Sequence, residues 1–590
     1  MLHVIQVTAE CQPFTYVGGL AQVPYQIASS FARKEWVKPY VIIPRSGHDF
    51  QPRSDIEIME FLKLFNNHIV YRTFFEGITF FFIGGGEYLD LTVYPPSPED
   101  KYKALDFVKC SNELLKYLLK NELEGKAVIL HAHDWQSGLT IPLAKLDASV
   151  KPTPPCMYTM HNYFQAKCPS THPIISKEMC LNRLGYDWLN KYLSNGHEGF
   201  IDPMSKGIIF DRTALYFADV GSSVSKDYAK CLIQNYGEIH YPTVARNKPM
   251  LGILNGVNPK EHSPKAILNL KNIFEENELT KICEALNIDL EKISNLDKAD
   301  NKVQLKKYAK LLLFTLLKKW QNCQVLPKPR VGNISEIVNS LIHKDLNWDI
   351  DDILCVYVGR IAEQKGFDIL VQCVPHVISL NDRTRFIFMG SGGYPKDEKK
   401  LIIYGGEIYN KNVVLLEMFS PEIRDLLFIA ADIFAMPSRY EPCGLTPFEA
   451  MGTGGTPCVV NPVGGLKEIV LDNEIGVHIK PSFYDDIIVK NYPCPPEEAL
   501  SIAINQLIKI ISDKNRYNYI INRCFERVKE TQFSWDFVAN KYLHAYDISM
   551  QKYMQYIYNY EDIKQEKNAW LKNYIGALDY FQKIDLKVRG

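Results

Sequence analysis

The sequence predicts an α/β fold with two doubly wound, Rossmann-like halves, and three observations lead to it. Short apolar runs alternate with amphipathic helical stretches through the first 260 residues, and a second series of the same kind starts at residue 353. This alternation is typical of parallel sheets with helices on both faces. The chain has 590 residues, too many for one hydrophobic core, because cores stop growing near about 250–300 residues.

The apolar runs are predicted to be the strands of the two sheets. In the first half they are His3–Val7, Tyr40–Ile43, Ala127–His131, Met157–Thr159 and Val220–Val224. In the second half they are Ile353–Val358, Phe386–Met389, Val413–Leu415, Ile433–Ala435 and Pro457–Val460. Each run is short and is followed by helix or turn signals, as expected for buried parallel strands.

The pattern divides the chain into residues 1–252, residues 253–535 and a helical tail, 536–590. Residues 259–350 are rich in Lys, Asn and Leu and poor in glycine, and we interpret them as an insertion in the second part. Its helix Val303–Trp320 follows Asp300 and Asn301, which are suited to cap a helix start. We expect the lysines of this helix to lie in solvent, although a basic, apolar helix can also contact a partner or a membrane surface.

Composition and charge exclude several classes of protein. The net charge is −1, so no global field attracts nucleic acid or an anionic membrane. The fourteen cysteines show neither CxxC pairs nor zinc-ligand spacing, which favours reduced thiols. Met1 leads directly into a strand without a leader, and the longest apolar run, Leu311–Leu317, is shorter than the ~20 residues of a membrane span. We therefore expect a cytoplasmic protein.

A glycine pair follows the first predicted strand and precedes a helix. The segment runs from Glu10 to Leu20 and contains Gly18 and Gly19. Adjacent glycines at this place allow the backbone to approach a phosphate and to direct its amides toward it, together with the helix N-terminus. An ordinary tight turn explains the glycines equally well.

Two further motifs follow strands of the second half. Arg360 stands at the end of one strand, and Lys365 comes five residues later, before a glycine. Ligands of doubly wound sheets bind at such strand ends, and two cations there are suited to a diphosphate. The segment Met436–Glu449 places Glu441 and Glu449 around a glycine turn, where a carboxylate can hold sugar hydroxyls or stabilise positive charge at an anomeric carbon.

These segments, in this order, resemble the bacterial glycogen and plant starch synthases of glycosyltransferase family 5, which have the GT-B fold of two Rossmann-like domains facing across a cleft, with C-terminal helices returning to the first domain. The similarity extends to His131-Ala132-His133-Asp134-Trp135, Tyr158-Thr159-Met160-His161-Asn162, Leu254-Asn255-Gly256-Val257-Asn258 and Phe533-Ser534-Trp535. It covers most of residues 1–550 apart from the insertion.

The resemblance implies a retaining enzyme that moves glucose from ADP-glucose or UDP-glucose to an α-1,4-glucan, with the glucan on the side of the first domain. Arg360 and Lys365 would bind the diphosphate, and Glu441 would contact the transferred glucose. The resemblance also places His161 near the anomeric centre, Asp134 beside the cleft and Asn255 at the hinge between domains. The other implied binding residues are Tyr16, Gly18, Gly19, Tyr94, Cys443, Gly444, Leu445, Thr446 and Glu449.

No metal or other cofactor is expected, because side-chain cations would neutralise the phosphates. Asp349-Ile350-Asp351 has the form of a metal-binding DxD triplet, but it lies in a polar turn before a strand. We therefore predict no metal site.

The sequence departs from the family at three positions. Tyr16 stands where a lysine usually precedes the glycine pair, Gln22 replaces an acidic residue, and Asp425 lies near a usual histidine. Losing one charge-assisted hydrogen bond to phosphate costs ~1.5–3 kcal/mol, so we expect weaker activity and altered donor handling.

Two other interpretations stay open. One is a silent glucan-binding or priming protein that keeps the fold. The other is an enzyme similar to glycosyltransferase family 4 that acts on a small acceptor, as the Glu441/Glu449 spacing and the Gly464-Gly465 turn also allow.

Overall fold

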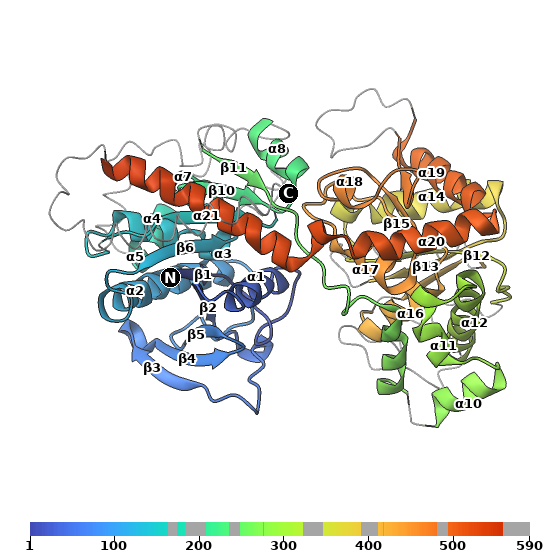
Figure 1. Cartoon of the computed structure of the whole chain (residues 1–590), viewed down its shortest axis with the longest axis horizontal. Helices are drawn as coiled ribbons and strands as arrows, with labels where there is room; N and C mark the ends of the chain where they lie inside the picture. Colours follow the sequence, from blue (N-terminus) through green and yellow to red (C-terminus); the bar gives the residue numbers. More distant parts are fainter. Residues whose placement is uncertain are drawn as a thin grey trace. The chain divides into compact units, whose positions relative to one another are not determined.

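The chain folds into two compact units, each built on one large sheet (Figure 1). The computed structural model describes residues 1–150, 152–162, 174–184, 208–234, 248–274, 277–321, 346–390, 411–416, 418–480 and 494–558. The first unit comprises Met1–Gly256 and Trp535–Gly590, and the second comprises Val257–Ser534. The final described helix therefore belongs to the first unit and is no separate tail; residues 559–590 lie outside the described part.

The sheet of the first unit has the strand order β11-β10-β7-β6-β1-β2-β5-β4-β3. The parallel strands are β1 (Leu2–Val7), β2 (Val37–Pro44), β5 (Ile78–Gly84), β6 (Ala127–His133), β7 (Cys156–Met160), β10 (Val220–Ser223) and β11 (Met250–Gly252). The helices are α1 (Gln22–Ala32), α2 (Glu99–Asn121), α3 (Trp135–Gly138), α4 (Thr140–Leu146), α5 (Lys177–Leu184), α7 (Phe210–Phe217) and α8 (Lys226–Gln234).

The prediction of a purely parallel sheet is wrong at one edge of the first sheet, where two strands are antiparallel. They are β4 (Ile69–Phe75), which pairs with β5, and β3 (Met59–Lys63), which pairs with β4. The sequence analysis also missed β5, although its run ITFFFIG is almost entirely buried. Edge strands expose one side to solvent and so lack the continuous apolar run of a central parallel strand.

The sheet of the second unit is parallel throughout its described strands. Its order is β14-β13-β12-β15-β16-β17, with β12 (Ile353–Val358), β13 (Thr384–Met389), β14 (Val413–Leu416), β15 (Ile433–Met436), β16 (Cys458–Val460) and β17 (Gly476–His478). The helices are α14 (Phe367–Leu380), α16 (Pro421–Ala430), α17 (Leu445–Gly454), α18 (Leu466–Ile469), α19 (Pro496–Ile511) and α20 (Lys514–Val528). Every strand predicted in this half is present, within a few residues of the expected bounds.

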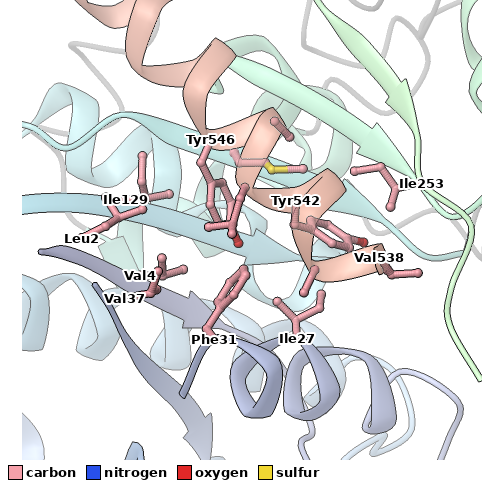
Figure 2. Close-up of a cluster of buried hydrophobic side chains, with 14 of the residues drawn as sticks. Leu2, Val4, Ile27, Phe31, Val37, Ile129, Ile253, Val538, Tyr542 and Tyr546 are labelled. Carbon is pink, nitrogen blue, oxygen red and sulfur yellow. The ribbon is translucent and has the colours of Figure 1, made fainter. Parts of the chain in front are cut away.

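The C-terminal helix α21 (Trp535–Tyr558) completes the core of the first unit. Its buried residues Val538, Tyr542 and Tyr546 face Ile27 and Phe31 of α1, as Figure 2 shows. Strand residues from β1, β2 and β6 fill the other side of the same cluster. The last described turns of the chain thus cover a face of the sheet that would otherwise expose apolar surface.

The insertion is part of the second unit and forms η4 (Pro264–Asn272), α10 (Glu278–Ala285), α11 (Leu290–Ser294) and α12 (Lys302–Gln321); η4 and α12 pack against α16. The predicted cap is confirmed, because the Asn301 side chain accepts a hydrogen bond from the amide of Gln304 at 3.1 Å. No helix among the described residues has the length and apolarity that a bilayer crossing requires.

The expectation of solvated lysines is wrong for two lysines of the predicted span Val303–Trp320, and Lys302, the first residue of α12, is buried as well. Lys306 is fully buried, and its Nζ donates to the Gly454 carbonyl at 2.7 Å and to Thr456 Oγ1 at 2.9 Å. Burial lowers the pKa of Lys306 to about 7. Lys310 is also buried and pairs with Asp432 at 2.6 Å. Burying these lysines requires partners at the end of α17 and just before β15, which a local helical pattern does not reveal.

Removal of the Lys310 cation tests how much this contact stabilises the second unit. In Lys310→Ala, Asp432 stays buried without its cation, so we expect the free energy of unfolding to fall by about 3–5 kcal/mol. Urea unfolding measures the change. Lys307→Ala on the same helix is the control: the pair of Lys307 with Asp351 is partly exposed, and its loss should cost less than about 1 kcal/mol. Equal losses in the two variants would contradict the assignment.

Candidate active site

In the first unit, the loop after β1 is organised by a buried carboxylate. Glu10 is fully buried, and its Oε2 accepts hydrogen bonds from the amides of Val17 at 2.7 Å and Gly18 at 2.9 Å. Burial raises the pKa of Glu10, and hydrogen bonds from Tyr94 and the two amides oppose that rise. Of the two glycines whose amides were predicted to face a phosphate, Gly18 donates to Glu10 in this structure.

Tyr94 and Tyr16 flank this loop and present ring surface to solvent. The Tyr94 hydroxyl donates to Glu10 Oε1 at 2.6 Å, while 44% of the residue is exposed. Tyr16 is 54% exposed, and a Cβ added at Gly19 would meet nothing within 4 Å. A cavity of about 240 Å³ opens beside Tyr94 and is lined by Val93, Lys103, Phe107, Trp135 and Gln136, among others. The loop thus offers aromatic faces and open space beside Gly19.

Asp134 joins the carboxyl ends of β6 and β7. Its Oδ1 accepts hydrogen bonds from the amides of His161 at 2.6 Å and Asn162 at 3.3 Å. Its backbone has φ +57° and ψ 174°, a conformation that residues other than glycine adopt only at a cost of about 1–3 kcal/mol. Burial raises the pKa of Asp134 well above its usual range. The structure therefore uses Asp134 to hold the His161 main chain.

Three histidines lie next to one another at the ends of these strands. His161 Nε2 is 2.9 Å from His133 Nδ1, and His133 Nε2 is 3.0 Å from Gln6 Oε1. The rings of His131 and His133 lie 3.9 Å apart, centroid to centroid. Burial lowers the pKa of His131 and His133 well below the usual value and that of His161 to about 3. All three rings are neutral near pH 7.

In the second unit, the loops after β12 and β15 bring Lys365 and Glu441 into contact. Lys365 Nζ donates to Glu441 Oε2, and the two side chains are 16% and 8% exposed. Arg360 is exposed at the start of the same loop and donates to Gln364 Oε1 at 2.9 Å. The structure thus brings together three of the predicted residues at the carboxyl end of the parallel sheet, where such sheets bind ligands.

Two glycines allow these loops to pack closely. Gly366 has φ +66°, and a Cβ there would lie 2.0 Å from the Pro437 carbonyl oxygen. Gly464 has φ +52°, and a Cβ there would lie 1.8 Å from the Glu441 carbonyl oxygen. Side chains at either position would push the loops apart. The second glycine turn therefore supports the backbone of Glu441.

The remaining predicted residues of this half lie at the start of α17. Gly444, with φ +86°, precedes the helix; Leu445 and Thr446 are its first two residues, and Cys443 is buried. Glu449 lies one turn later and is 3.6 Å from Arg424 of α16. Asp425 pairs with Arg424 at 2.8 Å, and burial raises the pKa of Asp425 to about 6.

Asn255 lies one residue before the boundary between the units and is 5% exposed. Its Oδ1 is buried and has no hydrogen-bond partner among the described residues. The Asp349–Asp351 triplet precedes β12, at the end of the strand opposite to Arg360, and its carboxylates pair with Arg383 and Lys307.

Sequence reasoning missed two contributors to this site. Glu10 stands in the glycine motif, but its role depends on Tyr94, 84 positions away. The sequence assigns no role to His133 itself, because its contact with Gln6 comes from 127 positions away. The only local signal was the spacing of His131, His133 and Asp134 at a strand end, where alternate side chains point to the same face.

The chain is similar to known glycosyltransferases over most of its length. The chain matches the family described as starch synthase catalytic domain over residues 3–245 and the family described as glycosyl transferases group 1 over residues 338–490. The glycogen synthase of Chlamydia muridarum is 25% identical over 576 residues, covering 92% of this chain and 100% of the relative. The glycogen synthase of Clostridium novyi is 22% identical over 567 residues, covering 94% and 100%.

Solved structures show a similar fold. The catalytic domain of starch synthase IV from Arabidopsis thaliana, bound to ADP and acarbose, has a TM-score of 0.62 and 20% identity and covers 93% of this chain and 99% of its own. Sucrose-phosphate synthase from Thermosynechococcus elongatus has a TM-score of 0.51 and 16% identity, with coverage of 94% and 100%. Together with the two units, each built on a mainly parallel sheet, these likenesses confirm the predicted GT-B fold class.

Asp425 gives the stability a predictable dependence on pH. Its folded-state pKa of about 6 exceeds the ordinary value of 3.8, so folding favours the protonated form. That contribution is present below about pH 4 and is lost as the pH rises through about 6, an effect of about 3 kcal/mol.

Urea unfolding of the unchanged protein and of Asp425→Asn between pH 4 and 7 measures it. The difference in free energy of unfolding should change across this range, because only the unchanged protein carries the Asp425 carboxyl. Parallel curves would show that Asp425 keeps an ordinary pKa.

Proposed function

Because the chain belongs to the glycogen and starch synthase family of glycosyltransferases, we propose that it transfers glucose from ADP-glucose or UDP-glucose to the non-reducing end of an α-1,4-glucan, with retention of anomeric configuration. The observation that carries the proposal is the contact of Lys365 with Glu441 beside Arg360. It gathers two cations and a carboxylate at the edge of a parallel sheet, as a diphosphate-linked sugar requires.

In this proposal Arg360 and Lys365 neutralise the departing diphosphate. Lys365 exchanges part of its contact with Glu441 for phosphate oxygens, and the Glu441 carboxylate then faces the sugar, where positive charge develops as the bond to the diphosphate breaks. Backbone amides at Cys443 and Gly444 and the start of α17 add partial positive charge toward the donor. The incoming 4-hydroxyl attacks from the face that the diphosphate leaves, which retains the configuration.

The first unit supplies the acceptor side and the contacts to the sugar. His161, held by Asp134 and His133, lies near the anomeric centre, and the exposed rings of Tyr94 and Tyr16 stack on sugar or base, as aromatic faces do in carbohydrate sites. Asn255 allows the units to move at their boundary, and Glu449 contacts the donor from the second turn of α17.

We also propose that no metal takes part, because two side-chain cations match the charge of a diphosphate. Dialysis against a chelator should leave the rate of transfer unchanged. A rate that disappears and returns with Mg²⁺ would contradict this assignment.

Transfer assays test the function directly. Purified protein is incubated with a panel of nucleotide sugars, with and without glycogen, and the products are sized. We expect elongation of glycogen by ADP-glucose or UDP-glucose. Transfer of one sugar to a small acceptor would favour the enzyme similar to glycosyltransferase family 4, and binding of glycogen without transfer from either donor would favour a silent glucan-binding protein.

Loss of the Lys365 cation should lower turnover strongly. Lys365→Ala removes one charge-assisted contact to the diphosphate, and we expect kcat/KM to fall by about 10- to 100-fold or more. Cys458→Ala, in the buried strand β16, is the control and should keep nearly full turnover. Similar losses of kcat/KM in both variants would contradict the assignment of Lys365 to the diphosphate.

Restoring the usual lysine at position 16 should raise kcat/KM for the donor. In Tyr16→Lys, a cation replaces an exposed ring beside the glycine pair, and we expect kcat/KM for the donor to rise by about 10-fold. Tyr16→Met removes the hydroxyl without adding charge. Comparing it with Tyr16→Lys separates the effect of the charge from the effect of side-chain length. If Tyr16→Lys lowers the activity as much as Tyr16→Met, the aromatic ring itself is what the donor needs.

A further inference from the structure

We infer that Arg439 and Asp368 are a positioning pair for the transfer, because their forked contact holds two loops of the second unit together. One is the loop after β12, which carries Arg360 and Lys365, and the other is the loop after β15, which carries Glu441. The role in transfer rests on the proposed function, whereas the link between the loops follows from the contacts alone.

Arg439 bonds to the loop after β12 through both its main chain and its side chain. Its backbone amide donates to the carbonyl of Gln364 at 2.9 Å, and its Nη1 donates to the carbonyl of Glu363 at 2.8 Å. These two acceptors directly precede Lys365 in the chain, and Arg439 stands two residues before Glu441. The bonds of Arg439 therefore join the loops right beside the contact between Lys365 and Glu441.

Asp368 fixes the direction of the Arg439 guanidinium. Its Oδ1 accepts from Nη1 at 2.6 Å and its Oδ2 accepts from Nη2 at 2.5 Å, and the side chains of Arg439 and Asp368 are 17% and 22% exposed. Two parallel bonds of this kind match the planar fork of arginine, which lysine does not have. Asp368 is the second residue of α14, so the fork is anchored in the first turn of a helix, where the helix dipole also favours a carboxylate.

Gln364 extends the link to Arg360. Its Nε2 donates to the carbonyl of Tyr440 at 3.2 Å, and a carbonyl oxygen only accepts, so this bond fixes which end of the side-chain amide faces Tyr440. The amide oxygen Oε1 then accepts from Arg360 Nη2 at 2.9 Å. The same two loops are therefore joined a second time, and this second contact orients a cation of the candidate site.

The pair acts on the site without contacting the substrate. The positive charge of Arg439 is matched by the Asp368 carboxylate, so we expect the diphosphate to be bound by Arg360 and Lys365. Both of these cations stand on the loop after β12, whereas Glu441 stands on the other loop. A change in the spacing of the loops would move the Glu441 carboxylate relative to a bound diphosphate, and a misplacement of about 1 Å can slow a reaction about 100-fold.

Arg439→Lys tests the fork, because it keeps the cation and removes the two parallel bonds. We expect kcat for glucose transfer to fall by about 10- to 100-fold. The dissociation constant of ADP or UDP, whichever binds the unchanged protein, should stay nearly the same when isothermal titration calorimetry measures it on the full-length protein. A residue that only stabilises the fold would not separate turnover from nucleotide binding in this way.

Arg523→Lys is the matched control in the same unit. Arg523 contacts Glu474 through Nε at 3.0 Å and Nη2 at 2.6 Å, and the two side chains are 26% and 38% exposed. This pair joins α20 to the turn that enters β17, at the amino end of the parallel sheet, so kcat of Arg523→Lys should stay close to that of the unchanged protein. Equal losses of kcat in Arg439→Lys and Arg523→Lys, or an unchanged kcat in Arg439→Lys, would overturn the inference.

Asp368→Asn changes the other partner of the pair. Asparagine has one acceptor oxygen, so one of the two bonds is lost while the shape of the side chain is kept. If the pair acts as a unit, the double variant of Arg439→Lys and Asp368→Asn should lose little more kcat than the more affected single variant. Losses that multiply fully would show that the two residues act independently and would overturn the inference. If Arg439→Lys does not fold, Asp368→Asn still decides through the same comparison of kcat with nucleotide binding.

The positioning role and the proposed function fail in different ways. Hydrogen exchange of the full-length protein reports on the link without any transfer assay, because the peptide that contains Glu441 should exchange faster in Arg439→Lys than in Arg523→Lys. A protein that transfers no glucose but shows this difference contradicts the proposed function and keeps the link between the loops. An active enzyme with equal exchange in the two variants, or one whose kcat and nucleotide affinity fall together in Arg439→Lys, contradicts the positioning role alone.

Discussion

The ion pair between Lys365 and Glu441 is the contact on which the candidate site of the second unit depends. It joins loops from two strands that are neighbours in the sheet but 76 positions apart in the chain. Removing one partner of such a partly buried pair lowers the free energy of unfolding, because the other charge stays without its partner. A diphosphate can offer Lys365 a replacement partner, so the contact that orders the two loops also suits them to an anionic ligand.

The supporting structure around this pair is built for close packing. Gly366 and Gly464 remove side chains where backbone meets backbone, and Arg439 binds Asp368 through both guanidinium nitrogens, at 2.6 and 2.5 Å. Because Arg439 also bonds to the Gln364 and Glu363 carbonyls, the two loops are fixed along their length. A rigid edge of this kind holds charges in place before a substrate arrives, which is how electrostatic sites achieve their effect.

The first unit follows another principle, in which neutral buried groups orient one another. His131, His133 and His161 lie at the ends of adjacent strands, and Tyr546 of α21 contacts His131 at 2.8 Å. The C-terminal helix therefore supports the candidate site as well as the apolar core. The insertion helix α12 plays a comparable part in the second unit, where its buried Lys310 pairs with Asp432 at the entry to β15.

The sequence by itself determined the two-sheet α/β class, the central strands and the placement of Arg360, Lys365, Glu441 and Asp134 at strand ends, because these follow from local periodicity and from motifs of a few residues. The tertiary structure decided which groups those residues meet. Glu10 takes the Gly18 amide expected for phosphate, and two lysines expected in solvent are buried. The contact of Glu10 with Tyr94 spans 84 positions, and those of Lys306 span 148 and 150. A local pattern does not predict such contacts, because burial and long-range hydrogen bonds are properties of the packed chain.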